Sequence, residues 1–170
     1  VTITPTYSGA DVGNYSITDH STITADVAVK TLTATASAAN KVYDGTTTAT
    51  TTLTFTGLVG SETLNQSVGS TFDNKNVGTG KSVTVNSITL TDGTGLAANY
   101  SISPGQTTTA DITAKPLSVS GITASDKTYD GNDVATIDAT LVSYSGLLSG
   151  DVFNGTYTGA FSDKNVGTGK

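Results

Sequence analysis

The chain has 170 residues, a formal charge of −6 and no cysteine, methionine or tryptophan. All eight basic residues are lysines and fourteen acidic residues outnumber them, so the basic footprint of a nucleic-acid-binding protein is missing. The lack of cysteine excludes disulfides, thiol nucleophiles and thiolate metal sites, and no apolar run approaches the roughly 18 residues of a membrane span. We therefore expect no nucleic acid, no membrane span and no cofactor.

Short runs in which polar and apolar residues alternate predict β-strands along the chain. In chain order they cover residues 31–36, 52–56, 82–85, 88–90, 100–102 and 117–120. A period of two places the apolar residues on one buried face of a sheet. Dipeptides typical of turns separate these runs: Asp44-Gly45, Asp92-Gly93, Pro104-Gly105, Asp130-Gly131 and Asn154-Gly155. The pattern predicts an all-β fold made of small antiparallel β-sandwich-like (Ig-like) domains.

Three motifs occur twice and define an internal repeat. Their copies begin 85, 86 and 89 residues apart and cover residues 13–17 and 98–102, 41–45 and 127–131, and 76–81 and 165–170. Self-similarity at a fixed period decides the architecture, and a period near 85 residues is too long for a solenoid of short repeats. It predicts tandem small domains, each with a core of its own.

The junction between the copies can be placed by a fourth match. Residues 24–32 resemble residues 109–117, and Pro116 cannot donate a ladder hydrogen bond, which suits a junction. We therefore predict one complete repeat domain over residues 31–115, flanked by the C-terminal part of a preceding repeat over 1–30 and the N-terminal part of a following repeat over 116–170.

The motif Lys-x-Tyr-Asp-Gly is the most distinctive candidate site. Its members are Lys41, Tyr43, Asp44 and Gly45 in one copy and Lys127, Tyr129, Asp130 and Gly131 in the other. Asp-Gly favours a tight turn, and a tyrosine beside it can bury its ring. The motif is either a latch that sets the register of a hairpin or a binding or cross-linking site. Its recurrence favours the latch, because each domain must solve the same folding problem.

The segment after Phe72 offers a candidate calcium site. Asp73, Asn74 and Asn76 carry side-chain oxygens, which are the ligands that calcium prefers. The second copy has Ser162 and Asp163 where the first has Asp73 and Asn74, so its donor set differs. A polar turn that leads into the next strand is the alternative interpretation.

Lysine and asparagine recur together, which raises the possibility of an intramolecular isopeptide bond. Lys41, Lys75, Asn76 and Asn99 are the candidate residues in the complete repeat. The reaction requires burial that lowers the pKa of the lysine and raises the pKa of an assisting acid. Exposed lysines on a surface of low charge are the alternative.

The order of these motifs carries a resemblance. Lys-x-Tyr-Asp-Gly, Phe-x-x-Lys-Asn-Val-Gly-Thr-Gly-Lys, Ala-Asn-Tyr-Ser-Ile with Asn99 and Tyr100, and Ala-Asp-Ile-Thr-Ala-Lys-Pro-Leu follow one another here. This order resembles the YDG-type repeat domain of filamentous-haemagglutinin-like bacterial surface adhesins. The resemblance implies a structural stalk or filament repeat in a secreted protein at the bacterial cell surface. Its implied partners are neighbouring repeats or head-to-tail copies of itself, with a surface or glycan ligand at a tip outside this segment.

Two other classes of function compete with a stalk repeat. A carbohydrate- or calcium-binding β-sandwich module needs exposed aromatic or acidic residues on one face, and Tyr7, Tyr144 and Tyr157 are the available tyrosines. An enzyme is not expected, because the single histidine, His20, has no counterpart in the repeat and supports no Ser-His-Asp constellation. We expect His20 at the surface.

Overall fold

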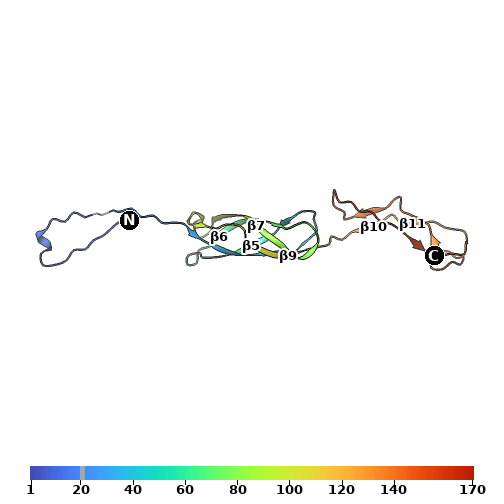
Figure 1. The fold of residues 1–170 in the computed structure, drawn as a ribbon, viewed down its shortest axis with the longest axis horizontal. Helices are drawn as coiled ribbons and strands as arrows, with labels where there is room; N and C mark the ends of the chain where they lie inside the picture. Colours follow the sequence, from blue (N-terminus) through green and yellow to red (C-terminus); the bar gives the residue numbers. More distant parts are fainter. Residues whose placement is uncertain (20–21) are drawn as a thin grey trace. The chain divides into compact units, whose positions relative to one another are not determined.

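A computed structural model describes residues 1–19 and 22–170, and His20 lies outside this part of the chain. The described residues form strands and two short 3-10 helices, so the prediction of an all-β, sandwich-like fold is confirmed (Figure 1). The chain divides into two compact units by its contacts. The first unit comprises Val1–Thr35, Thr54–Ser67 and Ile88–Ser103, and the second comprises Ala36–Leu53, Val68–Ser87 and Pro104–Lys170.

The elements follow one another closely, as expected for a chain rich in turn signals. They are η1 (Val12–Asn14), β1 (Lys30–Thr31), β2 (Thr33–Ala38), β3 (Lys41–Val42), β4 (Thr48–Ala49), β5 (Thr51–Thr56), β6 (Leu64–Phe72), β7 (Gly78–Asp92), η2 (Ala97–Asn99), β8 (Tyr100–Ser101), β9 (Thr107–Thr113), β10 (Ser118–Ser120), β11 (Thr123–Ala124), β12 (Val134–Ala135), β13 (Ile137–Asp138), β14 (Ser143–Ser145) and β15 (Gly159–Ala160).

The main core of the second unit lies on a five-stranded sheet with the order β3-β9-β7-β6-β4. Its buried cluster consists of Ala49, Phe72, Val83, Ala110 and Ile112. These residues come from strands that alternate buried and exposed positions, as the period of two predicts. The cluster is small, which agrees with the modest core expected of a domain of this size.

Two strand pairs are parallel, which the alternation pattern did not indicate. Strand β3 pairs with β9 so that Lys41 lies opposite Ile112, and β1 pairs with β8 so that Lys30 lies opposite Tyr100. A parallel pair needs a long connection, and here most of a repeat separates the partners in sequence. Period-two patterns reveal strands but not their partners, so this pairing could not be read from the sequence.

The first unit contains the β1–β8 pair and a small buried group beside it. Leu32 and Tyr100 are its buried large side chains, and Gly57 approaches the Leu32 side chain. The described residues of segment 1–29 are exposed throughout, and a single bridge between Thr2 and Thr22 links its two arms.

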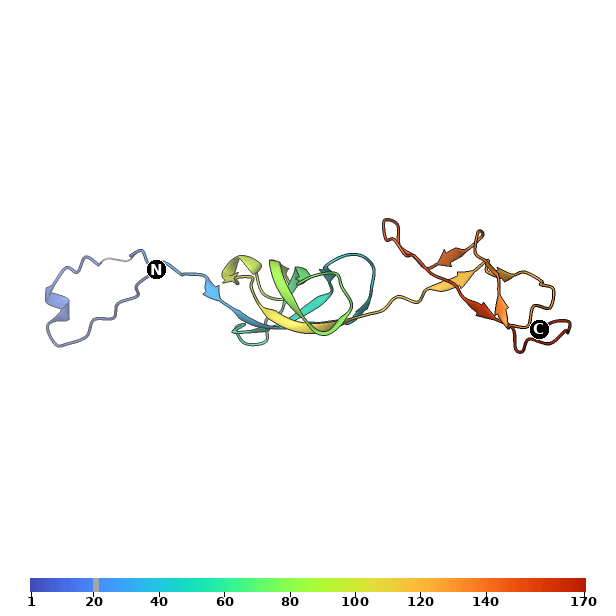
Figure 2. The ribbon, with the colours of Figure 1, turned by 45° about the vertical axis from the view of Figure 1, so that its right-hand side comes forward.

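Three short antiparallel pairs shape residues 116–170: β10–β14, β11–β13 and β12–β15 (Figure 2). One of them reproduces the register of the preceding copy. In β12–β15, Val134 lies opposite Ala160, as Thr48 lies opposite Thr71 in the pairing of β4 with β6. The repeat seen in the sequence is therefore also a repeat of strand pairing.

Candidate functional site: the lysine-centred turns

The ammonium group of Lys41 holds the Tyr-Asp-Gly turn together. Its Nζ donates to Asp44 Oδ1 at 2.8 Å, to the carbonyl oxygens of Thr46 at 2.8 Å and Thr48 at 2.9 Å, and to Thr46 Oγ1 at 3.2 Å. The same Nζ lies 5.4 Å from the centroid of the Phe72 ring, within reach of a cation–π interaction. With only 17% of its side chain exposed, Lys41 organises the turn from within.

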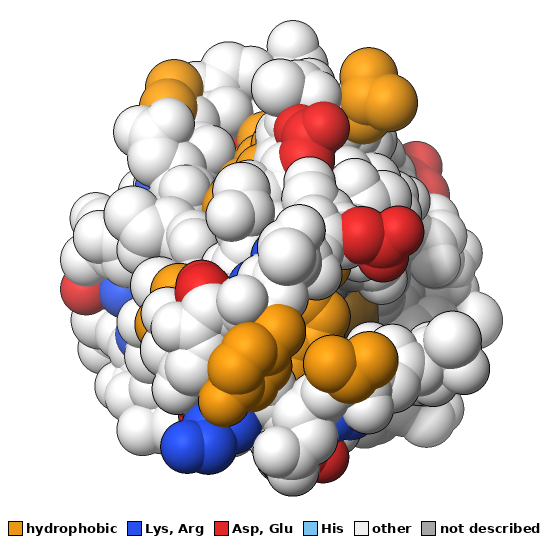
Figure 3. Space-filling view, turned by 90° about the vertical axis from the view of Figure 1, so that its right-hand side faces the viewer, with side chains coloured by type: hydrophobic (Ala, Val, Ile, Leu, Met, Phe, Trp, Pro, Cys, Tyr) orange, Lys and Arg blue, Asp and Glu red, His pale blue; other side chains and the backbone are white. Residues whose placement is uncertain are grey.

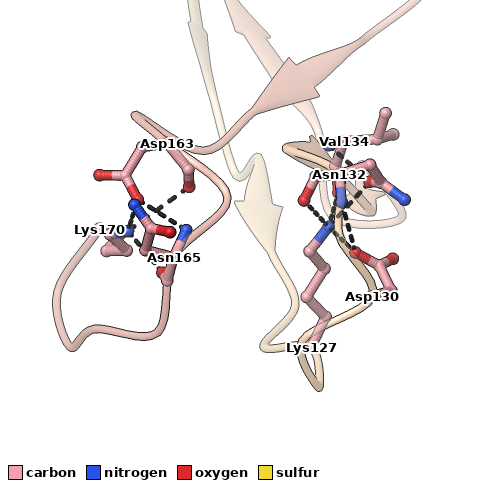
Figure 4. Close-up of polar contacts among 7 residues, drawn as sticks. All are labelled: Lys127, Asp130, Asn132, Val134, Asp163, Asn165 and Lys170. Carbon is pink, nitrogen blue, oxygen red and sulfur yellow. Dashed lines mark hydrogen bonds and ion pairs between the residues drawn. The ribbon is translucent and has the colours of Figure 1, made fainter.

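The second copy builds the same arrangement, which Figure 4 shows. Lys127 Nζ donates to Asp130 Oδ1 at 2.9 Å, to the carbonyl oxygens of Asn132 at 2.8 Å and Val134 at 3.1 Å, and to Asn132 Oδ1 at 2.9 Å. The Phe161 ring centroid lies 5.5 Å from this Nζ. The constellation thus recurs with one substitution, an asparagine amide oxygen in place of a threonine hydroxyl. We call the two arrangements the Lys41 latch and the Lys127 latch.

The local sequence explains why each latch forms. Asp44 Oδ1 accepts the backbone N–H of Thr46 at 2.9 Å, and Gly45 takes a φ of 79° that favours glycine. Asp130 and Gly131, with a φ of 80°, repeat this turn. The hydrogen bond from Lys41, reinforced by the Thr46 N–H, lowers the pKa of Asp44 to about 2. Both carboxylates are therefore ionised partners at neutral pH.

A second lysine closes the loop that follows Phe72. Lys81 Nζ lies 2.9 Å from Asp73 Oδ1 and donates to Asn74 Oδ1 at 2.8 Å, while Asn74 Oδ1 also accepts the N–H of Asn76 at 3.0 Å. The hydrogen bond from Lys81 lowers the pKa of Asp73. Lys81 is 9% exposed in its side chain, so the loop encloses it almost completely. We call this arrangement the Lys81 latch.

A β-bulge aims Lys81 at that loop. The register between β7 and β9 shifts between Gly78 and Lys81, and Gly80 takes a φ of 59° at the shift. Its N–H donates to Asp111 Oδ1 at 2.8 Å. A glycine with positive φ is the usual first residue of such a bulge. The motif Asn-Val-Gly-Thr-Gly-Lys is thus the sequence of a bulge followed by its lysine.

The second copy repeats this latch at Lys170, as Figure 4 also shows. Its Nζ forms a short ion pair with Asp163 and donates to the carbonyl oxygen of Asn165 at 2.6 Å. Gly169 takes a φ of 63°, as Gly80 does in the first copy. All four lysines of the repeated motifs are therefore bound by oxygen atoms of nearby turns.

The candidate calcium ligands lie around the Lys81 ammonium group. Asp73 and Asn74 direct an oxygen to Lys81 Nζ, and Asn76 contributes its backbone N–H to the turn. A calcium ion would have to displace this lysine from the two side-chain oxygens. It would also have to compete with the Asn76 N–H, which donates to Asn74 Oδ1. Among the described residues no group of three or more His, Cys, Asp or Glu could hold a metal ion.

The isopeptide candidates are arranged differently from what the reaction needs. The partners of Lys41 are a carboxylate, a hydroxyl and carbonyl oxygens, and Asn99 lies at the end of η2 in the other unit. In the second copy Lys127 does meet Asn132, but the hydrogen bond from Lys127 lowers the pKa of Asp130 beside it. A proton-shuttling acid needs the opposite shift.

The tyrosines of the two repeated motifs differ in role from the lysines. Tyr43 is half-buried and packs against the core cluster, and its hydroxyl donates to Asp151 Oδ1 at 3.2 Å. Its counterpart Tyr129 is 58% exposed. The Tyr43 ring therefore packs against the core, and its hydroxyl group bonds with a residue of the following copy.

Tyr100 is the buried anchor of the first unit. It is 7% exposed, forms a short hydrogen bond with the carboxylate of Glu62 and accepts the N–H of Val59 at 3.1 Å. The bond to Glu62 raises the pKa of Tyr100. Asn99, just before it, donates its backbone N–H to Leu96 and ends η2.

The role of the lysines in holding these turns together was not predicted from the sequence. Exposed lysines were the alternative to an isopeptide bond, although two of the motif lysines recur at the same distance from an aspartate. Lys41 and Asp44 are three residues apart, as are Lys127 and Asp130. The chain has few charged residues and repeats them at matching positions of the two copies. This recurrence was a signal that lysines and aspartates form half-buried ion pairs.

Comparison with known proteins places these features in a family. A family model described as YDG domain matches residues 28–110 and 113–170, which is most of the chain. No curated protein and no solved structure matches the chain significantly. No helix among the described residues is long and apolar enough to cross a membrane.

Proposed function

Because the chain belongs to the YDG domain family, we propose that it is a structural repeat in the stalk or filament of a large bacterial cell-surface adhesin or fibre. Its work is mechanical: each repeat closes a small β core, and successive repeats extend the protein away from the cell. A ligand-binding tip would lie outside this segment. Such an array raises the effective concentration of whatever the tip carries.

One observation carries the proposal, namely that the same internal latches are built in both copies. The aspartate and carbonyl partners of Lys41 and Lys127 match within 0.2 Å, at 2.8 and 2.9 Å for the aspartates and 2.9 and 3.1 Å for the last carbonyl oxygens. Each latch pairs its lysine with an aspartate of its own turn. A stalk built of tandem repeats requires that each repeat be stabilised by contacts within itself.

The exposure of equivalent residues supports completion by a neighbour. Ile112 is 1% exposed in the complete repeat, whereas Val27, which takes its place in the preceding copy, is 99% exposed. Tyr100 and Tyr15 form a similar contrast, at 7% and 73%. Each apolar side chain has a buried place in a complete domain, so we infer that neighbouring repeats, or head-to-tail copies adding strands, cover it.

The surface of the second copy agrees with that inference. On the face drawn in Figure 3, several hydrophobic side chains lie exposed beside polar and charged ones. Within residues 116–170 the most exposed large hydrophobic residues include Leu141 at 82%, Val152 at 84% and Val166 at 90%.

The tyrosines give little support to a carbohydrate-binding module. Tyr144 and Tyr157 join their hydroxyl groups in a short hydrogen bond, and the Phe153 ring lies 5.1 Å from the Tyr144 ring in an edge-on contact. Tyr7 bonds with Asp19 in the other unit. These rings are engaged with one another or with an acid, so they do not form an open platform for a sugar.

The proposal is tested on bacteria that make the parent protein. Antibodies raised against the 170-residue chain should label intact cells, and external protease should abolish the label while sparing a cytosolic control protein. Inserting two further copies of residues 31–115 should move a tip epitope measurably outward in electron micrographs. Labelling only after cell lysis would contradict the proposal.

A further inference from the structure

A loop of the following copy rests on the Lys41 latch within the second unit. Residues Gly146–Asp151 form this loop, and its carboxylate accepts the Tyr43 hydroxyl at 3.2 Å. A Cβ atom built on Gly45 would lie 3.4 Å from Leu148 Cδ1, so the leucine sits directly against the turn glycine. Val77 and Lys115 line the same shallow pocket beside Tyr43.

The complete repeat contains the same loop at residues 57–62. Both loops read Gly-Leu, then three other residues, then an acid, and the N–H of the acid closes the same turn. Glu62 N–H donates to Val59 O at 3.1 Å, as Asp151 N–H donates to Leu148 O at 3.1 Å. In both copies the first glycine has a positive φ, 108° at Gly57 and 100° at Gly146.

The first glycines of the loops also attach to their own copies in the same way, while the Glu62 carboxylate in addition accepts the Tyr100 hydroxyl of its own copy. Gly57 lies against Leu32, and Gly146 lies against Leu117, which is the residue equivalent to Leu32. Each loop is therefore a fixed part of its repeat, presented by the start of that repeat. The contact with Tyr43 joins one copy to the next and is independent of the latch inside either copy.

We propose that the tyrosine of each Lys-x-Tyr-Asp-Gly turn forms one half of a joint between consecutive repeats. The other half is the loop Gly-Leu-x-x-x-Asp/Glu of the following repeat. This inference rests on the proposed function as a tandem array, and it assigns to the tyrosine a partner and a role that the latch does not need.

The chemistry of the joint explains the residue types. The tyrosine hydroxyl donates a hydrogen bond to a carboxylate, and such a bond is stronger than one between two neutral groups. A Cβ atom at Gly45 would only touch Leu148, so it is the positive φ that disfavours any other residue there. Burial of one leucine adds an apolar contribution to the polar bond.

The second copy presents the tyrosine half of the joint uncovered. Tyr129 is 58% exposed, and a Cβ atom on Gly131 would meet no atom within 4 Å. Conversely, Val59 in the loop of the complete repeat is 54% exposed, although its equivalent Leu148 is half-buried against Gly45. The partner of Tyr129 is the Gly-Leu-x-x-x-Asp/Glu loop of a further repeat.

Spin-label distance measurements on the 170-residue chain test the joint. The chain has no cysteine, so Thr52→Cys and Thr158→Cys, at exposed positions of the second unit, give one clean label pair. With Tyr43 intact we expect a narrow distance distribution. Tyr43→Phe, which keeps the ring on the core, and Leu148→Ser should each widen it about twofold, because relative motion is the default once an interface is lost.

Tyr129→Phe is the matched control and should leave the distribution unchanged. Urea unfolding of each variant verifies that the domains still fold. Equal widths for the Tyr43, Leu148 and Tyr129 variants would overturn the joint, since the linker alone would then set the stiffness. That result would leave the surface-labelling test of the stalk untouched, so the two ideas can fail separately.

Discussion

Lys41 shows how a chain with few charges uses them. Its ammonium group has three hydrogens to donate and meets a carboxylate, a hydroxyl and two carbonyl oxygens. A lysine in such a place satisfies backbone acceptors that the turn itself leaves open. Its contribution lies in those bonds more than in net charge, because an exposed ion pair by itself is worth little.

Replacing Lys41 should therefore destabilise the complete repeat. Lys41→Met keeps the apolar stem near Phe72 but removes the donor, and stranded acceptors should lower the free energy of unfolding by about 1–3 kcal/mol. Urea denaturation measures this change. Lys75→Met, at an exposed position, is the control and should stay within about 0.5 kcal/mol of the parent chain. Identical midpoints for both variants would show that the latch adds no stability.

The aspartates of the latches predict how stability depends on pH. Hydrogen bonds from lysine lower the pKa of Asp44 from 3.8 to about 2 and lower the pKa values of Asp73, Asp130 and Asp163. A lowered folded-state pKa stabilises the fold above the unfolded pKa, and this contribution disappears as pH falls through the folded pKa. The urea midpoint should hold from pH 7 to 5 and fall between about pH 4 and 2. Asp44→Asn should make that fall shallower.

The bulge in β7 is the element that places Lys81. Gly80 takes a φ of 59°, and a left-handed conformation costs other residues roughly 1–2 kcal/mol. Gly80→Ala should reduce stability by about that amount, measured by urea denaturation. Gly13→Ala is the control, because Gly13 has no positive φ and an added Cβ meets no atom within 4 Å there. If the Gly80→Ala chain unfolded at the same urea concentration as the parent chain, the bulge would not be needed for stability.

Strands also differ in how well their backbone is protected. Val83 and Val85 in β7 are 0% and 1% exposed, and β7 pairs on both sides, whereas the described part of segment 1–29 is exposed with one bridge. Hydrogen exchange followed by mass spectrometry should find slow amides in β7 and β9 and fast ones in segment 1–29. Slow exchange throughout segment 1–29 would contradict the exposed arrangement described here.

Strand positions could be predicted from the sequence because they depend on local periodicity. Leu53 alternates with exposed threonines in β5, and Val83 and Val85 alternate with polar residues in β7, as the pattern indicated. The length of β7 could not be predicted, because Gly80 interrupts the alternation while the bulge keeps the strand paired. The Tyr-Asp-Gly motif was predicted as a hairpin latch or a binding site, but β3 and β4 beside it pair with β9 and β6 and not with each other. Its lysine bonds could not be predicted, because they depend on folded geometry.

At the scale of the whole molecule, the repeat joins two kinds of contact. Latches such as that of Lys41 close each copy internally, and the bond of Tyr43 to Asp151 connects one copy to the next. Sequence similarity alone could show that the copies exist, but it could not distinguish these two kinds of contact. The motif that looked like one site thus has two functions, with the lysine serving its own copy and the tyrosine serving its neighbour.

The central claim is that each repeat is a separately latched mechanical unit, and single-molecule force spectroscopy tests it most directly. A chain of concatenated copies of residues 31–115 should unfold in discrete steps. Each step should lengthen the chain by about 280–300 Å, the extended length of 85 residues at roughly 3.3–3.6 Å per residue. Lys41→Met should lower the unfolding force without changing the step length. Smooth extension without steps, or equal forces for both chains, would contradict the account.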